Sequence, residues 1–290
     1  MSEALRPDNV FETSYKTYTY HIDPYFHAKE SFLFEILQEA AGRHASLKKL
    51  SIPDLNREGK TWVVTRTRLA IDRYTVWPEE IHVETWAQDP VKLFFTRGTR
   101  AFLKDGTPLF RAISWWAVLD VSTGRPVRPQ LMNERIGVPP EDESHPRIDS
   151  SFAKRLTYEN LDLEALADYV PSIRYEDTDS NHHVNNVAYI NWIMESLPDS
   201  FRNAFKPCWL DVSWMNQTYR HDKVQMISGA FPGEGLESPN PHLFHQLVRL
   251  EEDGSKTVLF SCESRWKTRE ELVPIYSEQK TWPSISEQER

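Results

Sequence analysis

The chain has 290 residues, a formal net charge of -9 and a hydrophobic content of 39%. This composition is typical of a globular protein, and the acidic balance argues against nucleic acid as a general partner. No segment approaches the length of a membrane span, and the first residues lack the apolar run of a signal peptide. We therefore expect a cytoplasmic protein that does not associate with a membrane, with Cys208 and Cys262 as reduced thiols.

The first part of the chain predicts strands around one helix. Residues 1–14 are expected to form a loose arm, and alternating residues at 15–22 predict a strand. An apolar stripe at helical spacing then predicts a helix capped by Ser31, on which His44 is expected to be a packed, hydrogen-bonded histidine rather than a ligand. Period-two patterns predict four further strands, at 62–71, 80–86, 94–103 and 109–119. An Asp-Gly turn between the last two is a strong hairpin signal.

The same order of elements returns after a proline-rich segment. Residues 126–165 predict a linker, with a short helix near 161–167. A strand at 169–175 and a helix at 186–197 are then predicted. Four strands follow, at 209–215, 223–230, 242–251 and 257–266. An internal duplication is the economical explanation, and burial of each apolar helix face against a half-buried sheet predicts an α+β fold.

A dense polar cluster lies between the strand and the helix of the second half. It contains Asp179, Asn181 and His183, and either Asn185 or Asn186 can cap the helix. A helix N-terminus offers unpaired N–H groups that can hold an oxyanion. Near neutral pH Asp179 would be ionised and could act as base or nucleophile, while His183 could transfer a proton. These residue types therefore predict a site for attack on an acyl group.

Two other interpretations of this cluster remain open. Loops rich in Asp and Asn commonly serve only as caps and turns. A metal site is a second rival, although the carboxylates and imidazoles match no recognised ligand spacing. The sequence contains no Walker A loop, dinucleotide fingerprint or paired Cys-x-x-Cys, so we expect neither a cofactor nor a bound metal.

Residues 179–196 resemble the signature of acyl-acyl carrier protein thioesterases, Asp-x-Asn-x-His-Val-Asn-Asn-x-x-Tyr-Ile-x-Trp-Ile-x-Glu-Ser. Residues 61–66, 71–74 and 83–86 are similar to the first domain of the same family. The resemblance implies a double hotdog, in which two tandem antiparallel sheets are each wrapped on a long central helix. It also implies metal-free hydrolysis of the thioester that links a fatty acyl chain to acyl carrier protein.

The resemblance suggests a division of the chain. The expected parts are an N-terminal arm at 1–14, a first hotdog domain with the acyl-chain pocket at 15–125, a linker at 126–165, a catalytic hotdog domain at 166–275 and a C-terminal tail at 276–290. A double hotdog already contains the pairing that single hotdog chains obtain by dimerising, so both a monomer and a homodimer remain open.

The family's Asp, Asn and His fall on Asp179, Asn181 and His183. The plant members have an acidic residue next to a cysteine on the following strand, where this chain has Gln217 and Thr218. No cysteine stands where a thiol nucleophile would be needed, so we reject a Cys-His mechanism. Gln217 cannot act as a base, but it could hydrogen-bond a water or the His183 ring.

Two rival functions remain open from the sequence. One is a thioesterase that acts on acyl-coenzyme A, because the hotdog scaffold hosts both activities. The other is a non-catalytic acyl-binding or regulatory protein, which the glutamine at position 217 keeps in consideration. The predicted partner in the first interpretation is acyl carrier protein.

Overall fold

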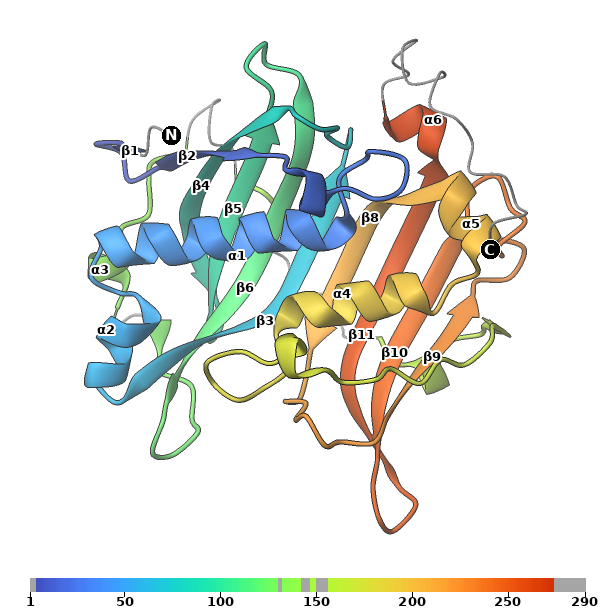
Figure 1. Ribbon diagram of the computed structural model, residues 1–290. Coiled ribbons are helices and arrows are strands. Elements are labelled where there is room, and N and C mark those ends of the chain that lie inside the picture. The colour runs from blue at the N-terminus through green and yellow to red at the C-terminus, as the bar shows by residue number, and fades with distance from the viewer. Residues whose placement is uncertain (1–3, 130–131, 142–146, 150–155, 274–290) are drawn as a thin grey trace.

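The computed structural model describes residues 4–129, 132–141, 147–149 and 156–273, and their strands form one antiparallel sheet (Figure 1). The strands of the first half are β1 (Ala4–Leu5), β2 (Phe11–Lys16), β3 (Lys60–Ile71), β4 (Glu80–Val91), β5 (Phe94–Phe102) and β6 (Pro108–Asp120). Those of the second half are β7 (Glu164–Ala165), β8 (Phe205–Trp214), β9 (Val224–Ala230), β10 (His242–Leu250) and β11 (Lys256–Thr268).

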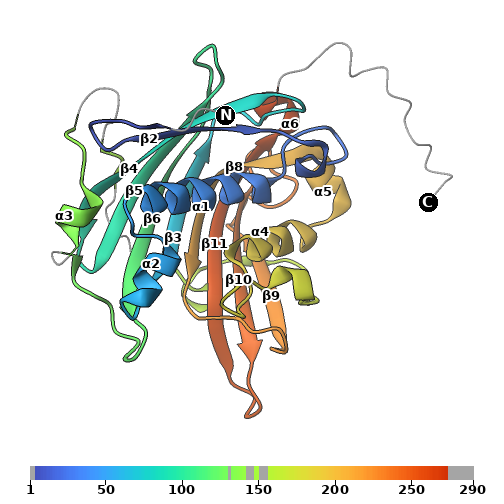
Figure 2. The same ribbon diagram turned by 60° about the vertical axis from the view of Figure 1, so that its left-hand side comes forward.

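Two helices, α1 (Glu30–Leu47) and α4 (Asn186–Glu195), cover the same face of the sheet (Figures 1 and 2). The shorter helices are α2 (Ile52–Arg57), α3 (Asn133–Ile136), α5 (Asp199–Ala204) and α6 (Arg269–Leu272). Among the described residues, no helix combines the length and the hydropathy that a membrane span requires.

The strand order shows that the two halves repeat one plan. The sheet runs β1-β2-β4-β5-β6-β3-β8-β11-β10-β9-β7. Read outward from its centre, the first half is β3-β6-β5-β4-β2 with the short β1 at its edge, and the second is β8-β11-β10-β9-β7. Each half therefore places one long helix on an antiparallel sheet of five strands, to which the first half adds β1, and this confirms the α+β double hotdog. Pairing between β3 and β8 joins the two sheets into one.

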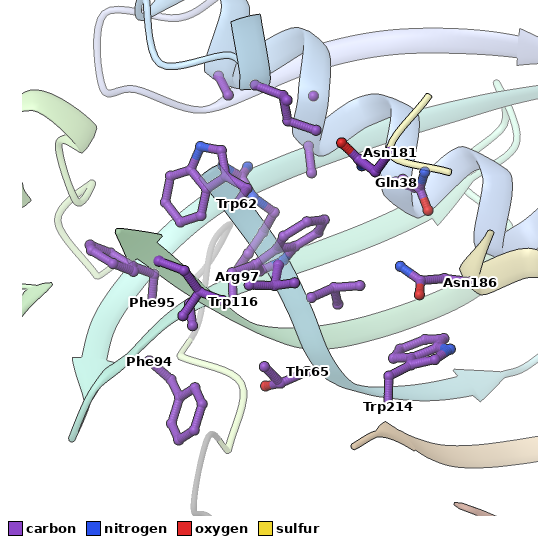
Figure 3. Close-up of a pocket in the computed structure, with 18 of the residues that line it drawn as sticks. Gln38, Trp62, Thr65, Phe94, Phe95, Arg97, Trp116, Asn181, Asn186 and Trp214 are labelled. Carbon is purple, nitrogen blue, oxygen red and sulfur yellow. The ribbon is translucent and has the colours of Figure 1, made fainter. Parts of the chain in front are cut away.

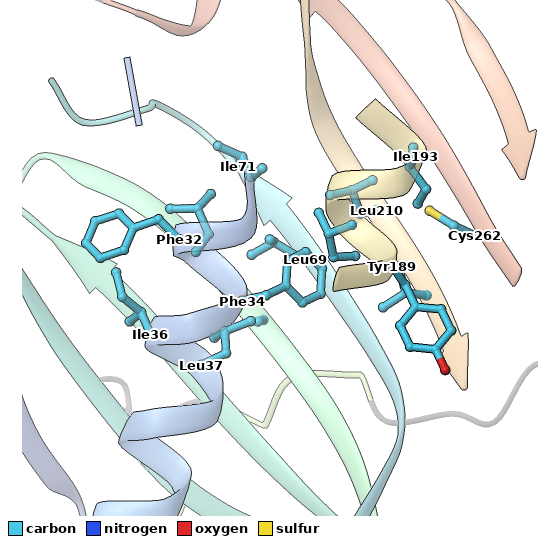
Figure 4. Close-up of a cluster of buried hydrophobic side chains, with 14 of the residues drawn as sticks. Phe32, Phe34, Ile36, Leu37, Leu69, Ile71, Tyr189, Ile193, Leu210 and Cys262 are labelled. Carbon is cyan, nitrogen blue, oxygen red and sulfur yellow. The ribbon is translucent and has the colours of Figure 1, made fainter. Parts of the chain in front are cut away.

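The helices bury their apolar faces in a core that spans both halves (Figure 4). Phe32, Ile36 and Leu37 of α1 recur at helical spacing and are almost fully buried. Leu69 of β3 and Leu210 of β8 belong to the same cluster, as do three residues of α4, namely Tyr189, Ile190 and Ile193. Complete burial of such a side chain contributes about 1.5–3 kcal/mol, so the shared core holds the halves together.

The N-terminal predictions need correction. β2 begins at Phe11 rather than near residue 15, and Val10 and Phe11 are fully buried, so residues expected in a loose arm enter the sheet. The strand ends at Lys16, and a 3-10 turn follows at Thr19–His21. Ser31 is not a cap, since it lies buried inside α1.

The predictions for 161–175 were also wrong. In place of a helix near 161–167, the short strand β7 pairs with the edge of β9. The predicted strand at 169–175 is reduced to one bridge between Tyr169 and Met226, followed by a 3-10 turn at Tyr175–Asp177. Pro171 has no N–H to donate, which explains why the strand does not continue. Parts of the predicted linker, at 130–131, 142–146 and 150–155, lie outside the described residues.

The other strand predictions agree with the structure to within a few residues, and both Asp-Gly hairpins are present. Gly106 and Gly254 have φ values of +88° and +83°, which explains the need for glycine there. Both cysteines are free thiols, with Cys262 buried and Cys208 partly buried.

A buried ion pair lies at the seam between β3 and β8. Arg66 donates from Nε and Nη2 to the two oxygens of Asp211 at 2.7 and 2.6 Å. Arg68 donates from Nε to Asp211 Oδ2 at 2.8 Å, and both guanidinium groups lie over the ring of Trp115. One carboxylate therefore binds two arginines. It is largely shielded from solvent, because the Asp211 side chain is only 8% exposed.

We expect Asp211→Ala to destabilise the protein by about 3–5 kcal/mol, because it leaves buried arginine charges without their carboxylate. Urea denaturation measures this free energy of unfolding. Asp72→Ala is the matched control, since Asp72 is more exposed and lies 3.9 Å from Arg111. That variant should change stability by less than about 0.5 kcal/mol. Equal effects of the two variants would contradict a structural role of the buried pair.

Candidate active site

A cavity of about 980 Å³ joins the two halves (Figure 3). Its first-half walls come from α1, the α2 region and strands β3, β5 and β6, and they are largely apolar and aromatic, including Leu50, Trp62, Phe94, Phe95 and Trp116. Its second-half wall contains the N-terminus of α4 and the end of β8. All four residues predicted from the sequence line this cavity: Asp179, Asn181, His183 and Gln217.

Backbone hydrogen bonds hold the loop that carries three of these residues. The N–H of Asp179 donates to the carbonyl of His183 at 2.8 Å, and His182 N–H donates to the Asp179 carbonyl at 3.0 Å. His182 has a φ of +61°, which closes the turn. Asp179 Oδ1 accepts from the N–H of Asn181 at 2.8 Å. One carboxylate oxygen is therefore engaged, and Oδ2 has no partner among the described residues.

Among the described residues, one backbone amide at the start of α4 has no acceptor. Asn185 is the N-cap, and its side chain accepts from Val187 N–H at 2.9 Å. The amide of Ala188 donates to the Asn185 carbonyl, and that of Val184 donates to the Thr218 carbonyl. Within the described chain, the N–H of Asn186 has no acceptor, and the residue lines the cavity. An unpaired amide at the start of a helix is the kind of donor that can stabilise an oxyanion.

Gln217 is positioned by a tyrosine that the sequence analysis did not single out. Tyr219 Oη donates to Gln217 Oε1 at 2.9 Å, and the Tyr219 ring meets the His183 ring edge-on at 5.0 Å. The carboxamide oxygen of Gln217 is thus occupied, while its NH₂ group remains a donor. In the part of the chain described, no hydrogen bond joins the His183 ring to Asp179 or Gln217.

Neighbouring polar residues have structural contacts. Asp177 accepts the N–H of Arg174 at 2.7 Å. Thr218 is fully buried, and Tyr189 Oη donates to its hydroxyl at 2.8 Å. Burial raises the pKa of Tyr189 to about 12, so this phenol stays protonated and keeps the bond across the neutral pH range. These contacts fix the segment before the loop and the residues that follow β8.

The first-half wall carries a charged group that the sequence analysis missed. Arg97 Nη1 donates to His44 Nδ1 at 2.9 Å and to Thr85 Oγ1 at 3.2 Å. Because a guanidinium only donates, His44 Nδ1 must accept and the imidazole proton lies on Nε2. The pKa of His44 is lowered to about 2, mainly by burial, and the positive charges of Arg97 and Lys48 lower it further. His44 is thus packed and hydrogen-bonded, as expected.

Models of two acyl-ACP thioesterase domains match the chain. The N-terminal domain matches residues 8–133 and the C-terminal domain matches residues 157–267. Among curated proteins, the chain is 30% identical over 276 residues to palmitoyl-acyl carrier protein thioesterase, chloroplastic, of Arabidopsis thaliana, covering 89% of this chain and 65% of that protein. The palmitoyl-acyl carrier protein thioesterase of Cuphea hookeriana is 25% identical over 281 residues. This match covers 91% of the present chain and 64% of the Cuphea protein. The chain thus spans slightly less than two thirds of these relatives.

Solved structures share the fold. The 12:0-ACP thioesterase from Umbellularia californica has a TM-score of 0.71 at 19% identity, with 91% of this chain and 99% of that chain covered. An acyl-ACP thioesterase from Bacteroides thetaiotaomicron has a TM-score of 0.69 at 22% identity, with 89% and 98% covered. Both halves of the sheet and both long helices are therefore part of a known architecture.

The low pKa of His44 predicts a specific pH dependence. Its pKa is about 6.5 in the unfolded chain and about 2 in the fold, so its contribution to stability is complete above pH 6.5 and is lost as the pH falls towards 2. In His44→Gln, an amide oxygen can still accept from Arg97. The fall in unfolding free energy between pH 6 and pH 4 should be shallower in this variant by about 1.4 kcal/mol per pH unit. Identical slopes in urea titrations would show that His44 takes up a proton in the fold.

Proposed function

The chain belongs to the acyl-ACP thioesterase family, and we propose that it hydrolyses fatty acyl-acyl carrier protein to free fatty acid and holo carrier protein. The observation that carries the proposal is the cavity, which leads from the polar loop at Asp179 into an aromatic and aliphatic space in the first half. A long acyl chain needs an apolar space of this kind, since each buried methylene contributes about 0.8 kcal/mol.

We assign the acyl chain to the first half of the molecule and the chemistry to the second. Asp179 and Asn186 lie on the second-half wall, whereas the walls of Trp62, Phe95 and Trp116 belong to the first. A thioester that enters with its carbonyl at the start of α4 can extend its chain beneath α1. This assignment matches the division into domains 15–125 and 166–275 expected from the sequence.

In the proposed reaction, the carbonyl oxygen accepts the N–H of Asn186, which stabilises the charge that develops there. The free Oδ2 of Asp179 either attacks the carbonyl carbon or takes a proton from an attacking water. Attack by the carboxylate expels the thiolate and forms a mixed anhydride, which water then hydrolyses. His183 protonates the departing thiolate, and the carboxamides of Asn181 and Gln217 orient the water and the carbonyl.

Asp179→Asn should lower turnover of acyl-carrier-protein thioesters by about 10²–10⁴-fold, because an amide is neither a base nor a nucleophile. Thiol release from carrier-protein substrates with a range of chain lengths measures this effect. Asp177→Asn is the matched control, because it removes a carboxylate only two residues from Asp179. The side chain of Asp177 accepts from the Arg174 backbone, and the residue does not line the cavity.

The same assay separates the rival functions. The proposal expects kcat/KM for a carrier-protein thioester to exceed that for the coenzyme A thioester of the same acyl chain. The reverse order would assign the protein to acyl-coenzyme A hydrolysis. Tight binding of both with no thiol release would indicate the non-catalytic acyl-binding protein. Full activity of Asp179→Asn would contradict the role given to Asp179.

A further inference from the structure

Arg97 places a positive charge inside the half of the cavity assigned to the acyl chain. It lies on β5 near Trp62 and Trp116 (Figure 3). Burial lowers the pKa of Arg97 to about 10, so the guanidinium still carries its charge at neutral pH. A purely hydrocarbon chain offers nothing to such a group, because methylenes neither accept hydrogen bonds nor balance a charge.

The charge has no carboxylate partner within the described chain. Among the described residues that line the cavity, one carries a carboxylate. This residue is Asp179, which lies on the second-half wall. The known partners of Arg97 are neutral: the imidazole of His44 and the hydroxyl of Thr85, both of which accept from Nη1. Lys48, the other cation of the lining, donates to Asn9 Oδ1 and adds further positive charge.

The remaining donors of Arg97 are available to a ligand. Its Nε and Nη2 have no hydrogen-bond partner among the described residues, and the residue lines the cavity. They are the part of the guanidinium that the described protein groups leave unused. His44 holds the guanidinium in this orientation: its ring stacks on Phe11 at 5.8 Å, and its Nδ1 occupies the opposite donor, Nη1. The guanidinium is thus a donor group held in place in the lining of the cavity.

We propose that the cavity selects acyl chains that carry an oxygen substituent, as a hydroxyl or a carboxylate, at the depth of Arg97. This inference rests on the proposed function for the identity of the ligand as an acyl chain. The oxygen accepts from Nε and Nη2 of Arg97, and the surrounding aromatic walls bury the methylenes on either side. A chain without this oxygen leaves the guanidinium desolvated and unpaired, which disfavours its binding.

Binding of non-hydrolysable analogues tests the proposal without any turnover. In these analogues the acyl group is joined to pantetheine through an amide, so that no free head-group carboxylate can reach Arg97. Unsubstituted, ω-hydroxy and ω-carboxy chains of equal length are compared over a series of lengths by isothermal titration calorimetry. The hydroxy and carboxy arms distinguish a neutral oxygen from a charged one as the preferred group.

Wild-type protein should bind an oxygenated analogue at least about tenfold more tightly than the unsubstituted one at one or more chain lengths. Arg97→Met, which keeps an unbranched side chain of similar length, should abolish or reverse this order. Arg111→Met is the matched control, because Arg111 is largely exposed on β6 and does not line the cavity, and it should leave the order unchanged.

Three outcomes would overturn the proposal. In the first, the unsubstituted analogue binds wild-type protein as tightly as the oxygenated analogues at every chain length. In the second, the preference for an oxygenated chain survives in Arg97→Met, and in the third no analogue binds. If the oxygen preference is present but carrier-protein thioesters are not hydrolysed, the proposed function fails and the binding proposal stands.

Discussion

The antiparallel pairing of β3 with β8 is the contact on which the rest of the structure depends. It runs from Arg66 opposite Ser213 to Ala70 opposite Trp209 and turns two half-sheets into one. Without it each half would expose the backbone donors and acceptors of a long central strand. The pairing also sets α1 and α4 on one face, so that their apolar sides share a core.

Buried charged groups connect the two halves at this seam and at a second place. On β3 and β8, Asp211 binds the guanidinium groups of Arg66 and Arg68. Elsewhere, Lys206, only 1% exposed, lies 2.7 Å from Glu30 at the start of α1 and 3.2 Å from Asp23. Each of these charges contacts at least one opposite charge, which is the condition under which buried ions are tolerated. They tie segments that are more than a hundred residues apart in the sequence.

The two copies of the plan differ in the length and packing of their long helices. In the first half, α1 has 18 residues and leaves a cavity beside its C-terminal part, whereas α4 has 10 residues and its Tyr189 ring packs against Phe260 of β11 at 5.1 Å. In the second half β10 carries His245, which is fully buried and bonded to Ser228 at 2.8 Å. The first half therefore contains most of the cavity, and the second half has a packed core beneath the polar loop that lines this cavity.

Much of this architecture could be predicted from the sequence because its signals are local. Period-two patterns predicted the long strands, and the cluster at 179–186 predicted the polar loop and its helix. The side of the sheet that a charged strand residue faces is not a local property. Arg97 and Arg100 lie three positions apart and so face opposite sides: Arg97 lines the cavity, while Arg100 pairs with Glu84. Tyr219 was missed for a similar reason, since its contact with His183 depends on how β8 ends beside the loop. The roles of Asp179, Asn181, His183 and Gln217 remain predictions.

A crystal structure with a bound acyl-pantetheine amide tests the central claim most directly, that one cavity unites an acyl-binding half with a catalytic half. The account predicts that the chain lies beneath α1 among Trp62, Phe95 and Trp116, with its carbonyl oxygen within hydrogen-bond distance of the Asn186 N–H and its carbonyl carbon next to Asp179 Oδ2. A chain bound in the second half, or a carbonyl remote from Asp179, would contradict it.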